Sequence, residues 1–319
     1  MKAVFVGNGS WGNALADVAR ENGHDVAVLG RDDSYSPLSD ADIIMLCVPS
    51  YALREVLRKI NAESQPKRDC LFIGICKGIE FDEETGKTAL ASQIVKEELG
   101  RRYYAHLAGP GFAKGLDEKE DTRLVVTQED WWNGVTLVSN SVPMTRRLLQ
   151  NDFLKIQQSL DLIGLQVVGA CRTTLSIVMG AAKELGYYHR KNTMAAIFGR
   201  IMVEINRFVA AFGGKQDTLV DIAGSGDLYL CNDPESRNFQ LGERVAGICS
   251  EDPEQRKRLI ETEVKCIGTV EGFLTSKTLW KIAQERNIDT PWTKAVYRLC
   301  HEGSDPRVIV AEILQRSVD

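Results

Sequence analysis

The chain contains 319 residues, of which 44% are hydrophobic and 26% are charged. It is therefore long and apolar enough to bury a core in each of two ordinary domains, which excludes disordered, collagen-like and disulfide-framework proteins. The formal net charge of −5 argues against broad, charge-driven nucleic-acid binding, although a local pocket can still collect Lys and Arg around a small phosphorylated ligand.

The first 130 residues alternate short β-branched runs with helical segments, which is the pattern of a parallel sheet covered by helices. A last strand at residues 151–156 leads into a long helix. The other strands are expected at residues 3–7, 25–29, 43–47, 70–75, 105–107 and 124–126. This half of the chain therefore predicts a Rossmann-type α/β domain over residues 1–160.

A glycine-rich loop follows the first expected strand. Gly7, Gly9 and Gly12 have the spacing G-x-G-x-x-G, and a helical segment follows them. A strand before and a helix after make this motif a specific sign of dinucleotide binding. Gly7 allows the tight turn, Gly9 lets the backbone approach a pyrophosphate, and Gly12 lets the helix pack closely on the strand. The helix N-terminus then favours the negative charge of the pyrophosphate.

The end of the second strand bears on the choice of nucleotide. NAD sites usually place Asp or Glu there to bind the ribose hydroxyls. Here Arg31 takes that place and Asp32 follows it. The planar guanidinium of Arg31 suits a 2′-phosphate, which favours NADP, while Asp32 leaves NAD open.

After about residue 160 the apolar residues recur at spacings of three and four. Helices are expected over residues 162–185, 194–212 and 274–288. We therefore expect an all-α, substrate-binding domain over residues 161–319. Its apolar helices make a homodimer plausible, and the charged segment 251–258 is expected to form a solvated helix start and face.

Several features indicate a cytoplasmic protein without stable membrane insertion. The longest apolar runs, residues 43–49 and 175–182, are too short to cross a bilayer. The strand-like start at residues 3–6 lacks the basic segment, apolar stretch and cleavage site of a secretory signal. The eight cysteines are scattered without a C-x-x-C pair, so we expect reduced thiols and no metal site.

Further motifs occur along almost the whole chain. They are GNGSWGNALA at residues 7–16, CVPS at 47–50 with ALR at 52–54, KGIE at 77–80, GPGFAK at 109–114, GSGDL at 224–228, SRN at 236–238, and VEG at 270–272 followed by Lys277. In this order they resemble the NAD(P)-dependent glycerol-3-phosphate dehydrogenases. The resemblance implies hydride transfer between nicotinamide and C2 of dihydroxyacetone phosphate, which gives sn-glycerol 3-phosphate for phospholipid synthesis.

The resemblance also implies two sets of contacts. With the three loop glycines, the cofactor contacts are Ser10, Trp11, Arg31, Lys77, Ala113, Arg237, Thr269 and Glu271. The substrate contacts are Lys77, Gly109, Gly111, Asp227, Ser236, Arg237 and Asn238.

Local chemistry agrees with four of these residues. Lys77 follows a strand at the carboxyl end, where ligands of such sheets collect. Ser236 is a good N-cap type before a helical segment, and Arg237 at a helix start is a ready phosphate site. Asp227 would be costly to bury without a partner, so it could orient a cationic catalytic group.

One departure from the family pattern concerns the catalytic centre. Arg172 stands where the family has a catalytic lysine, and Thr173 where it has an asparagine. Arginine keeps its proton in proteins, so it can hold the forming alkoxide but cannot act as the acid. Lys77, or a water held by Arg172, would then supply the proton. Lys183 returns to the same helix face but lies about 16 Å away along it.

Two smaller departures concern loop lengths. The connection from Arg31 to Asp42 is shorter than the family usually has. Between Asp227 and Ser236 the register is one residue short, and Cys231 lies near an expected threonine. Two other functions therefore stay open: a dehydrogenase of the 3-hydroxyacid type acting on another small anionic substrate, and a dinucleotide-binding protein without turnover.

Overall fold

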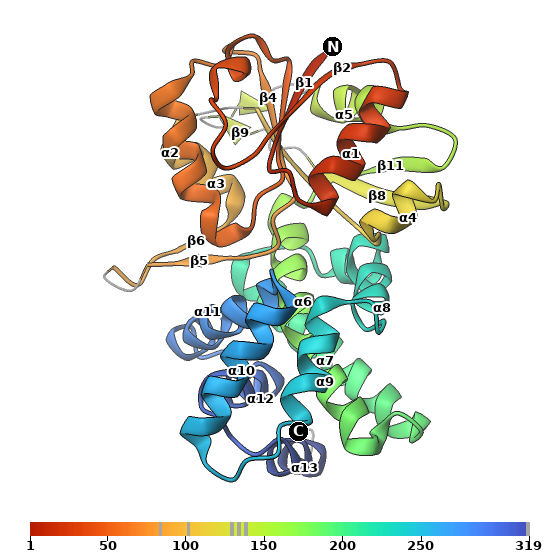
Figure 1. Cartoon of the computed structure of the whole chain (residues 1–319), viewed down its shortest axis with the longest axis vertical. Coiled ribbons are helices and arrows are strands. Elements are labelled where there is room, and N and C mark those ends of the chain that lie inside the picture. Colours follow the sequence, from red (N-terminus) through yellow and green to blue (C-terminus); the bar gives the residue numbers. More distant parts are fainter. Residues whose placement is uncertain (83–84, 101–102, 128–130, 133–134, 137–139, 317–319) are drawn as a thin grey trace. The chain divides into compact units, whose positions relative to one another are not determined.

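The computed structural model describes residues 1–82, 85–100, 103–127, 131–132, 135–136 and 140–316. It divides into two compact units, Met1–Gln166 and Val167–Asp319 (Figure 1). The division falls inside a long helix, whereas the sequence pattern places the boundary at residue 160. All eight cysteines lie in the described ranges, and none of them forms a disulfide.

The first unit is built on a sheet whose strand order is β11-β8-β7-β4-β3-β1-β2 in the described part of the chain. These strands are β1 (Lys2–Val6), β2 (Asp25–Leu29), β3 (Ile43–Leu46), β4 (Leu71–Gly74), β7 (Tyr104–Ala108), β8 (Thr122–Thr127) and β11 (Leu154–Ser159). Each corresponds to a strand expected from the sequence. The chain passes from β1 to β2 on one side and then to β3 on the other, so the carboxyl ends of β1 and β3 form the topological switch point.

The expectation of a parallel sheet is wrong at one edge. Strands β2, β1, β3, β4 and β7 pair in parallel, but β7 and β8 are antiparallel, and β11 is parallel to β8. The helix between β7 and β8, α4 (Ala113–Asp117), has only five residues. At 1.5 Å per residue it is about 8 Å long, too short to carry the chain back along β7.

Two small ladders were not expected from the sequence: β5 (Glu80–Phe81) with β6 (Thr88–Ala89), and β9 (Trp131–Trp132) with β10 (Val135–Thr136).

Helices cover both faces of the sheet (Figure 1). Along β1, Ala3 and Phe5 enter one buried cluster while Val4 and Val6 enter the other. The first cluster contains residues of α1 (Ser10–Glu21) and α5 (Ser141–Leu149), and the second contains residues of α2 (Leu53–Glu63) and α3 (Ala91–Leu99). A sheet buried on both faces explains why its strands read as continuous apolar runs.

The second unit is helical, as expected. Its helices are α6 (Leu162–Ala182), which begins in the first unit, α7 (Lys191–Phe212), α8 (Asp227–Cys231), α9 (Arg237–Ala246), α10 (Pro253–Ile267), α11 (Glu271–Glu285), α12 (Pro291–His301) and α13 (Pro306–Gln315). The three predicted helices correspond to α6, α7 and α11. The charged segment 251–258 forms the start of α10, where Asp252 accepts a hydrogen bond from the Glu254 N–H. Arg256 departs from the solvated face that was expected, because it is 5% exposed and donates to the Gly303 carbonyl.

Helix α6 is the central helix of this unit. The segment Leu162–Tyr187 is long and apolar enough to cross a membrane, but 94% of its most apolar window is buried inside the protein. Its apolar surface is thus covered by neighbouring segments, as in the core helix of a globular domain. At Gly180, a Cβ would overlap the carbonyl of Phe239, and at Gly242 it would overlap the carbonyl of Ile177. Helices α6 and α9 therefore cross with their backbones in contact.

Candidate active site

The glycine loop lies at the switch point of the sheet. Gly7 has φ +115°, a value that L side chains rarely adopt, and a Cβ there would overlap the carbonyl of Cys47 after β3. A Cβ at Gly12 would overlap the carbonyl of Gly7. Only glycine therefore fits at these two positions, because strand end, turn and helix start are in direct backbone contact.

The N-terminus of α1 has the form of an anion site. Gly9 is the N-cap residue, and no side chain caps the helix. Apart from Gly9 and its two chain neighbours, no described atom lies within 4 Å of the position that a Cβ of Gly9 would occupy. The space in front of the first-turn N–H groups is thus open, and the helix dipole favours negative charge there. These residues fit the pyrophosphate of a dinucleotide.

The turn after β2 presents an exposed cation. The Asp33 carboxylate accepts a hydrogen bond from the Gly30 N–H at 2.7 Å, and Lys59 donates to the Arg31 carbonyl at 2.9 Å. The side chains of Arg31 and Asp32 are both exposed. Within the described residues the Arg31 guanidinium has no ion-pair partner, so it is available to bind the phosphate group of a ligand.

Lys77 lies in the loop between β4 and β5 and is half-buried. Among the residues that the structure describes, its ammonium has no ion-pair partner. Three residues later, Glu80 accepts from the Arg54 Nε at 2.8 and 2.9 Å, which ties the end of this loop to α2. Arg54 also donates to Glu98 of α3 at 2.5 Å. A bidentate pair within a network is the kind of surface ion pair that holds its geometry.

The loop after β7 meets the glycine loop. Gly109 has φ +136°, and Ala113 begins α4. A Cβ at Gly111 would lie 3.0 Å from the Trp11 indole. Trp11, at the start of α1, therefore packs directly on this second glycine loop.

In the second unit, Arg172 and Asp227 form a buried ion pair. The Arg172 Nη2 lies 2.5 Å from the Asp227 Oδ2, and the side chains are 0% and 3% exposed. The Arg172 Nη1 also donates to the Cys231 Sγ at 3.0 Å. Burial disfavours the charged guanidinium, but the Asp227 carboxylate, followed by Cys231 and Glu271, holds the pKa of Arg172 above its ordinary value.

This pair leaves hydrogen-bonding capacity unused. The Arg172 Nε is buried without a hydrogen-bond partner among the described residues, and the 2.5 Å contact of Nη2 is not aligned as a hydrogen bond. A guanidinium has five N–H donors in a fixed plane. An incoming oxygen could therefore accept a hydrogen bond from the Nε–H while Asp227 keeps its place.

The starts of α9 and α11 meet beside this ion pair. Ser236 occupies the N-cap position of α9, as predicted, but its side chain makes no capping hydrogen bond. Arg237 is exposed, and no ion pair of its side chain occurs in the described part of the chain. The Asn238 Oδ1 accepts from the Gly272 N–H at 3.0 Å. Two expected cofactor contacts come just before Gly272 in the chain: Thr269, which is exposed, and Glu271, which is half-buried.

Three polar residues near this centre are assigned no role by the sequence motifs. Cys231 contacts Arg172, and the Ser176 hydroxyl donates to the Cys231 carbonyl. Asn232 has a buried side-chain amide with no hydrogen-bond partner among the described residues. One feature of the sequence could have indicated two of them. Ser176 follows Arg172 by four residues and Cys231 follows Asp227 by four, so each pair lies on one face of its helix.

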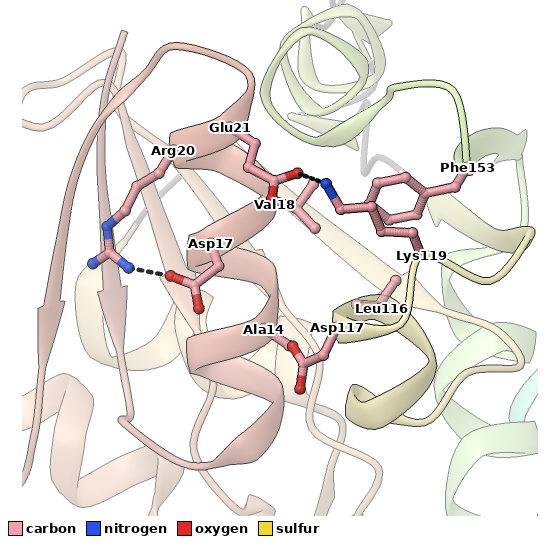
Figure 2. A pocket seen from close by; sticks show the side chains of 9 residues that line it. All are labelled: Ala14, Asp17, Val18, Arg20, Glu21, Leu116, Asp117, Lys119 and Phe153. Carbon is pink, nitrogen blue, oxygen red and sulfur yellow. Dashed lines mark hydrogen bonds and ion pairs between the residues drawn. The ribbon is translucent and has the colours of Figure 1, made fainter.

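A surface hollow of about 360 Å³ lies elsewhere, against the second half of α1 (Figure 2). Two ion pairs line it, Arg20 with Asp17 at 2.6 Å and Lys119 with Glu21 at 3.1 Å. It is formed by α1, α4 and Phe153 and does not include the glycine loop. We therefore do not assign it to the dinucleotide.

A doubly wound sheet with this glycine loop, followed by a helical unit with a buried cationic centre, defines a dinucleotide-dependent dehydrogenase. The model of the NAD-dependent glycerol-3-phosphate dehydrogenase N-terminus matches residues 31–132, and the model of the C-terminus of the same family matches residues 161–311. The chain belongs to the NAD-dependent glycerol-3-phosphate dehydrogenase family.

Individual relatives agree with this membership. The chain is 29% identical to glycerol-3-phosphate dehydrogenase [NAD(P)+] of Staphylococcus aureus, over 99% of this chain and 98% of that protein. It is similar to the crystal structure of glycerol-3-phosphate dehydrogenase from Coxiella burnetii, with a TM-score of 0.82, 25% identity and 99% of both chains covered. The enzyme structure from Saccharomyces cerevisiae, at 19% identity with 99% of both chains covered, has the same fold with a TM-score of 0.79.

Proposed function

We propose that this protein is an NAD(P)-dependent glycerol-3-phosphate dehydrogenase that interconverts dihydroxyacetone phosphate and sn-glycerol 3-phosphate, with Arg172 in the place of the family's catalytic lysine. The observation that carries this proposal is the similarity to the Staphylococcus aureus enzyme over almost the full length of both proteins. Such coverage includes the segments that hold the cofactor and the substrate in the family.

The cofactor is assigned to the glycine loop. A bound nicotinamide dinucleotide supplies the hydride chemistry that amino-acid side chains lack. The open N-terminus of α1 at Gly9 would hold its pyrophosphate, with Ser10 and Trp11 beside it. Arg31 would bind a 2′-phosphate, which favours NADP over NAD. Ala113, Thr269 and Glu271 are assigned by family likeness.

The substrate phosphate is assigned to the start of α9. Arg237 is exposed in the first turn of a ten-residue helix, where its charge and the helix dipole both favour an anion. Ser236 and Asn238 flank it. The Asn238 carbonyl oxygen is already bonded to Gly272, so its NH₂ group is the part that can donate to a phosphate oxygen.

Reduction of the ketone makes its oxygen negative. Arg172 would stabilise this charge by donating a hydrogen bond, and Asp227 would keep the guanidinium in place. Arginine keeps its own proton. We therefore assign proton delivery to Lys77 or to a water molecule held by Arg172. Gly109 and Gly111, which leave room for close approach, are assigned to the substrate by family likeness.

The test follows the absorbance of NADPH and NADH with dihydroxyacetone phosphate, using the native chain and Arg172→Lys. Turnover by the native chain supports the proposal, and a lower KM for NADPH than for NADH supports the role of Arg31. If only Arg172→Lys turns over, the native chain is a dinucleotide-binding protein. If neither turns over and a panel of other small anionic keto substrates is reduced, the chain is a dehydrogenase of the 3-hydroxyacid type.

We further propose a cytoplasmic homodimer that acts on this small phosphorylated substrate. The second unit exposes apolar side chains on its helices, including Leu274 and Val308, which are each 48% exposed. Light scattering after size-exclusion chromatography measures the mass in solution. A monomer at micromolar concentration would contradict the dimer.

A further inference from the structure

Two helices place pairs of residues face to face around the buried guanidinium. Helix α6 carries Arg172 and Ser176, and α8 carries Asp227 and Cys231. Residues four apart lie on the same face of a helix. Arg172 contacts both members of the α8 pair, and Ser176 donates to the backbone carbonyl of Cys231. Cys231 is thus fixed by its backbone and its side chain.

The contact with Cys231 fixes the plane of the Arg172 guanidinium, which the contact with Asp227 alone does not. The ion pair joins one guanidinium nitrogen, Nη2, to one carboxylate oxygen. A single contact leaves the planar group free to turn about the axis through that contact. The second contact, from Nη1 to the Cys231 Sγ at 3.0 Å, fixes the plane. The thiol also lies 3.7 Å from the Asp227 Oδ1, so it bridges the two charged groups.

We propose that Cys231 is a positioning residue for Arg172, and that the two side chains act as one unit in this chain. The orientation of the guanidinium decides where its unpartnered Nε points, and therefore where an oxygen can be held. A lysine carries its charge on one nitrogen and has no plane to fix. The chain resembles a family that has a lysine at the place of Arg172, and Cys231 lies near the position where that family has a threonine. This inference rests on the proposed function only for its activity readout.

The matched control is Cys300, a second buried cysteine. Cys231 is 8% exposed and Cys300 is 3% exposed. Cys300 lies on α12, and none of its described contacts is a hydrogen bond. Cys300→Ala therefore removes the same sulfur from a buried site without touching Arg172. Cys231→Ser keeps a small acceptor, whereas Cys231→Ala removes it.

The experiment is a double-mutant cycle on the full-length protein. We expect Cys231→Ala to lower kcat about tenfold, the effect of losing one hydrogen bond to a charged group. Cys231→Ser should recover at least part of this loss, and Cys300→Ala should leave kcat within about twofold. In the Arg172→Lys background, Cys231→Ala should lower kcat less than about threefold. An equal loss in both backgrounds, or an equal loss in Cys300→Ala, would overturn the proposal.

A second measurement does not depend on turnover. Nitrogen-15 NMR of the arginine side chains, with the Arg172 signal identified by its loss in Arg172→Lys, reports whether rotation of the guanidinium is hindered. We expect separate Nη signals in the native chain and in Cys300→Ala, and a single averaged signal in Cys231→Ala. If the native chain reduces no dihydroxyacetone phosphate, the proposed function fails and this spectrum still decides the role of Cys231. Separate Nη signals in Cys231→Ala would refute that role.

Discussion

Replacement of Asp227 by asparagine isolates the energy of the buried ion pair. Asn has almost the same shape as Asp, but it leaves the Arg172 charge buried without a counter-charge. The Arg172 side chain is 0% exposed and that of Asp227 is 3% exposed, so bulk solvent does not screen the unpaired charge. Breaking a buried pair by removing one partner costs about 3–5 kcal/mol. For a unit of this size, that corresponds to a fall in Tm of roughly 6–20 °C.

Urea unfolding at constant pH measures this change in the free energy of unfolding, and thermal unfolding measures Tm. The control is Asp17→Asn, which breaks the exposed pair of Asp17 and Arg20, whose side chains are 63% and 44% exposed. Such a surface pair contributes less than about 1 kcal/mol. If Asp227→Asn destabilises the protein no more than Asp17→Asn does, the guanidinium is not held as a desolvated charge, and the reasoning about its position is wrong.

Three further predictions concern separate sites. Burial raises the pKa of Glu204 to about 7 although it accepts hydrogen bonds from Thr293, whereas an unfolded Glu has a pKa of about 4.3. The folded state therefore binds this proton more tightly, so its contribution to stability is present below about pH 4 and is lost as the pH rises through 7. Unfolding free energies at pH 5 and pH 8 should show a fall of about 2–3 kcal/mol that Glu204→Gln lacks, and the same fall in that variant would contradict the assignment. Arg237→Ala should raise the KM for dihydroxyacetone phosphate at least about tenfold because the phosphate loses a charge-assisted partner; steady-state kinetics with an unchanged KM would remove Arg237 from the substrate site. Gly9→Val should lower Tm only slightly, since its Cβ meets open space and the remaining cost is that Val is a poorer N-cap residue than Gly. It should weaken NADPH binding at least about tenfold in a fluorescence titration; native affinity would argue against a pyrophosphate at Gly9.

The sequence predicts much of this fold because its signals are local. Continuous apolar runs mark strands that are buried on both faces, and β1 shows this through Val4 and Phe5, which enter different clusters. The direction of β8 is not encoded in that pattern, since parallel and antiparallel strands can have the same residues. The strand pair β5 and β6 has two residues in each strand, too few to show a period.

In the candidate site, too, the sequence predicts the features that depend on local spacing and does not predict those that depend on packing between distant segments. The need for glycine at Gly12 comes from the nearby Gly7 carbonyl, and at Gly7 from its positive φ and the Cys47 carbonyl after β3; the spacing of the motif indicates both. The contact of Arg172 with Cys231 joins residues that are 59 positions apart in the sequence. It depends on how α6 and α8 pack, so no local sequence pattern predicts it. Ser236 illustrates an intermediate case: its residue type correctly marks the start of α9, but its hydroxyl makes no capping bond.

The backbone contact between α6 and α9 has a consequence for substrate choice. Because Gly180 and Gly242 leave no side chain between these helices, neither helix can slide or tilt without a clash of main chains. Arg172 on α6 and Arg237 on α9 are therefore mounted on a single stiff frame. On the proposed assignment, in which Arg237 binds the phosphate and Arg172 the carbonyl oxygen, this frame would fix the distance between the two groups and disfavour a substrate that is one carbon longer.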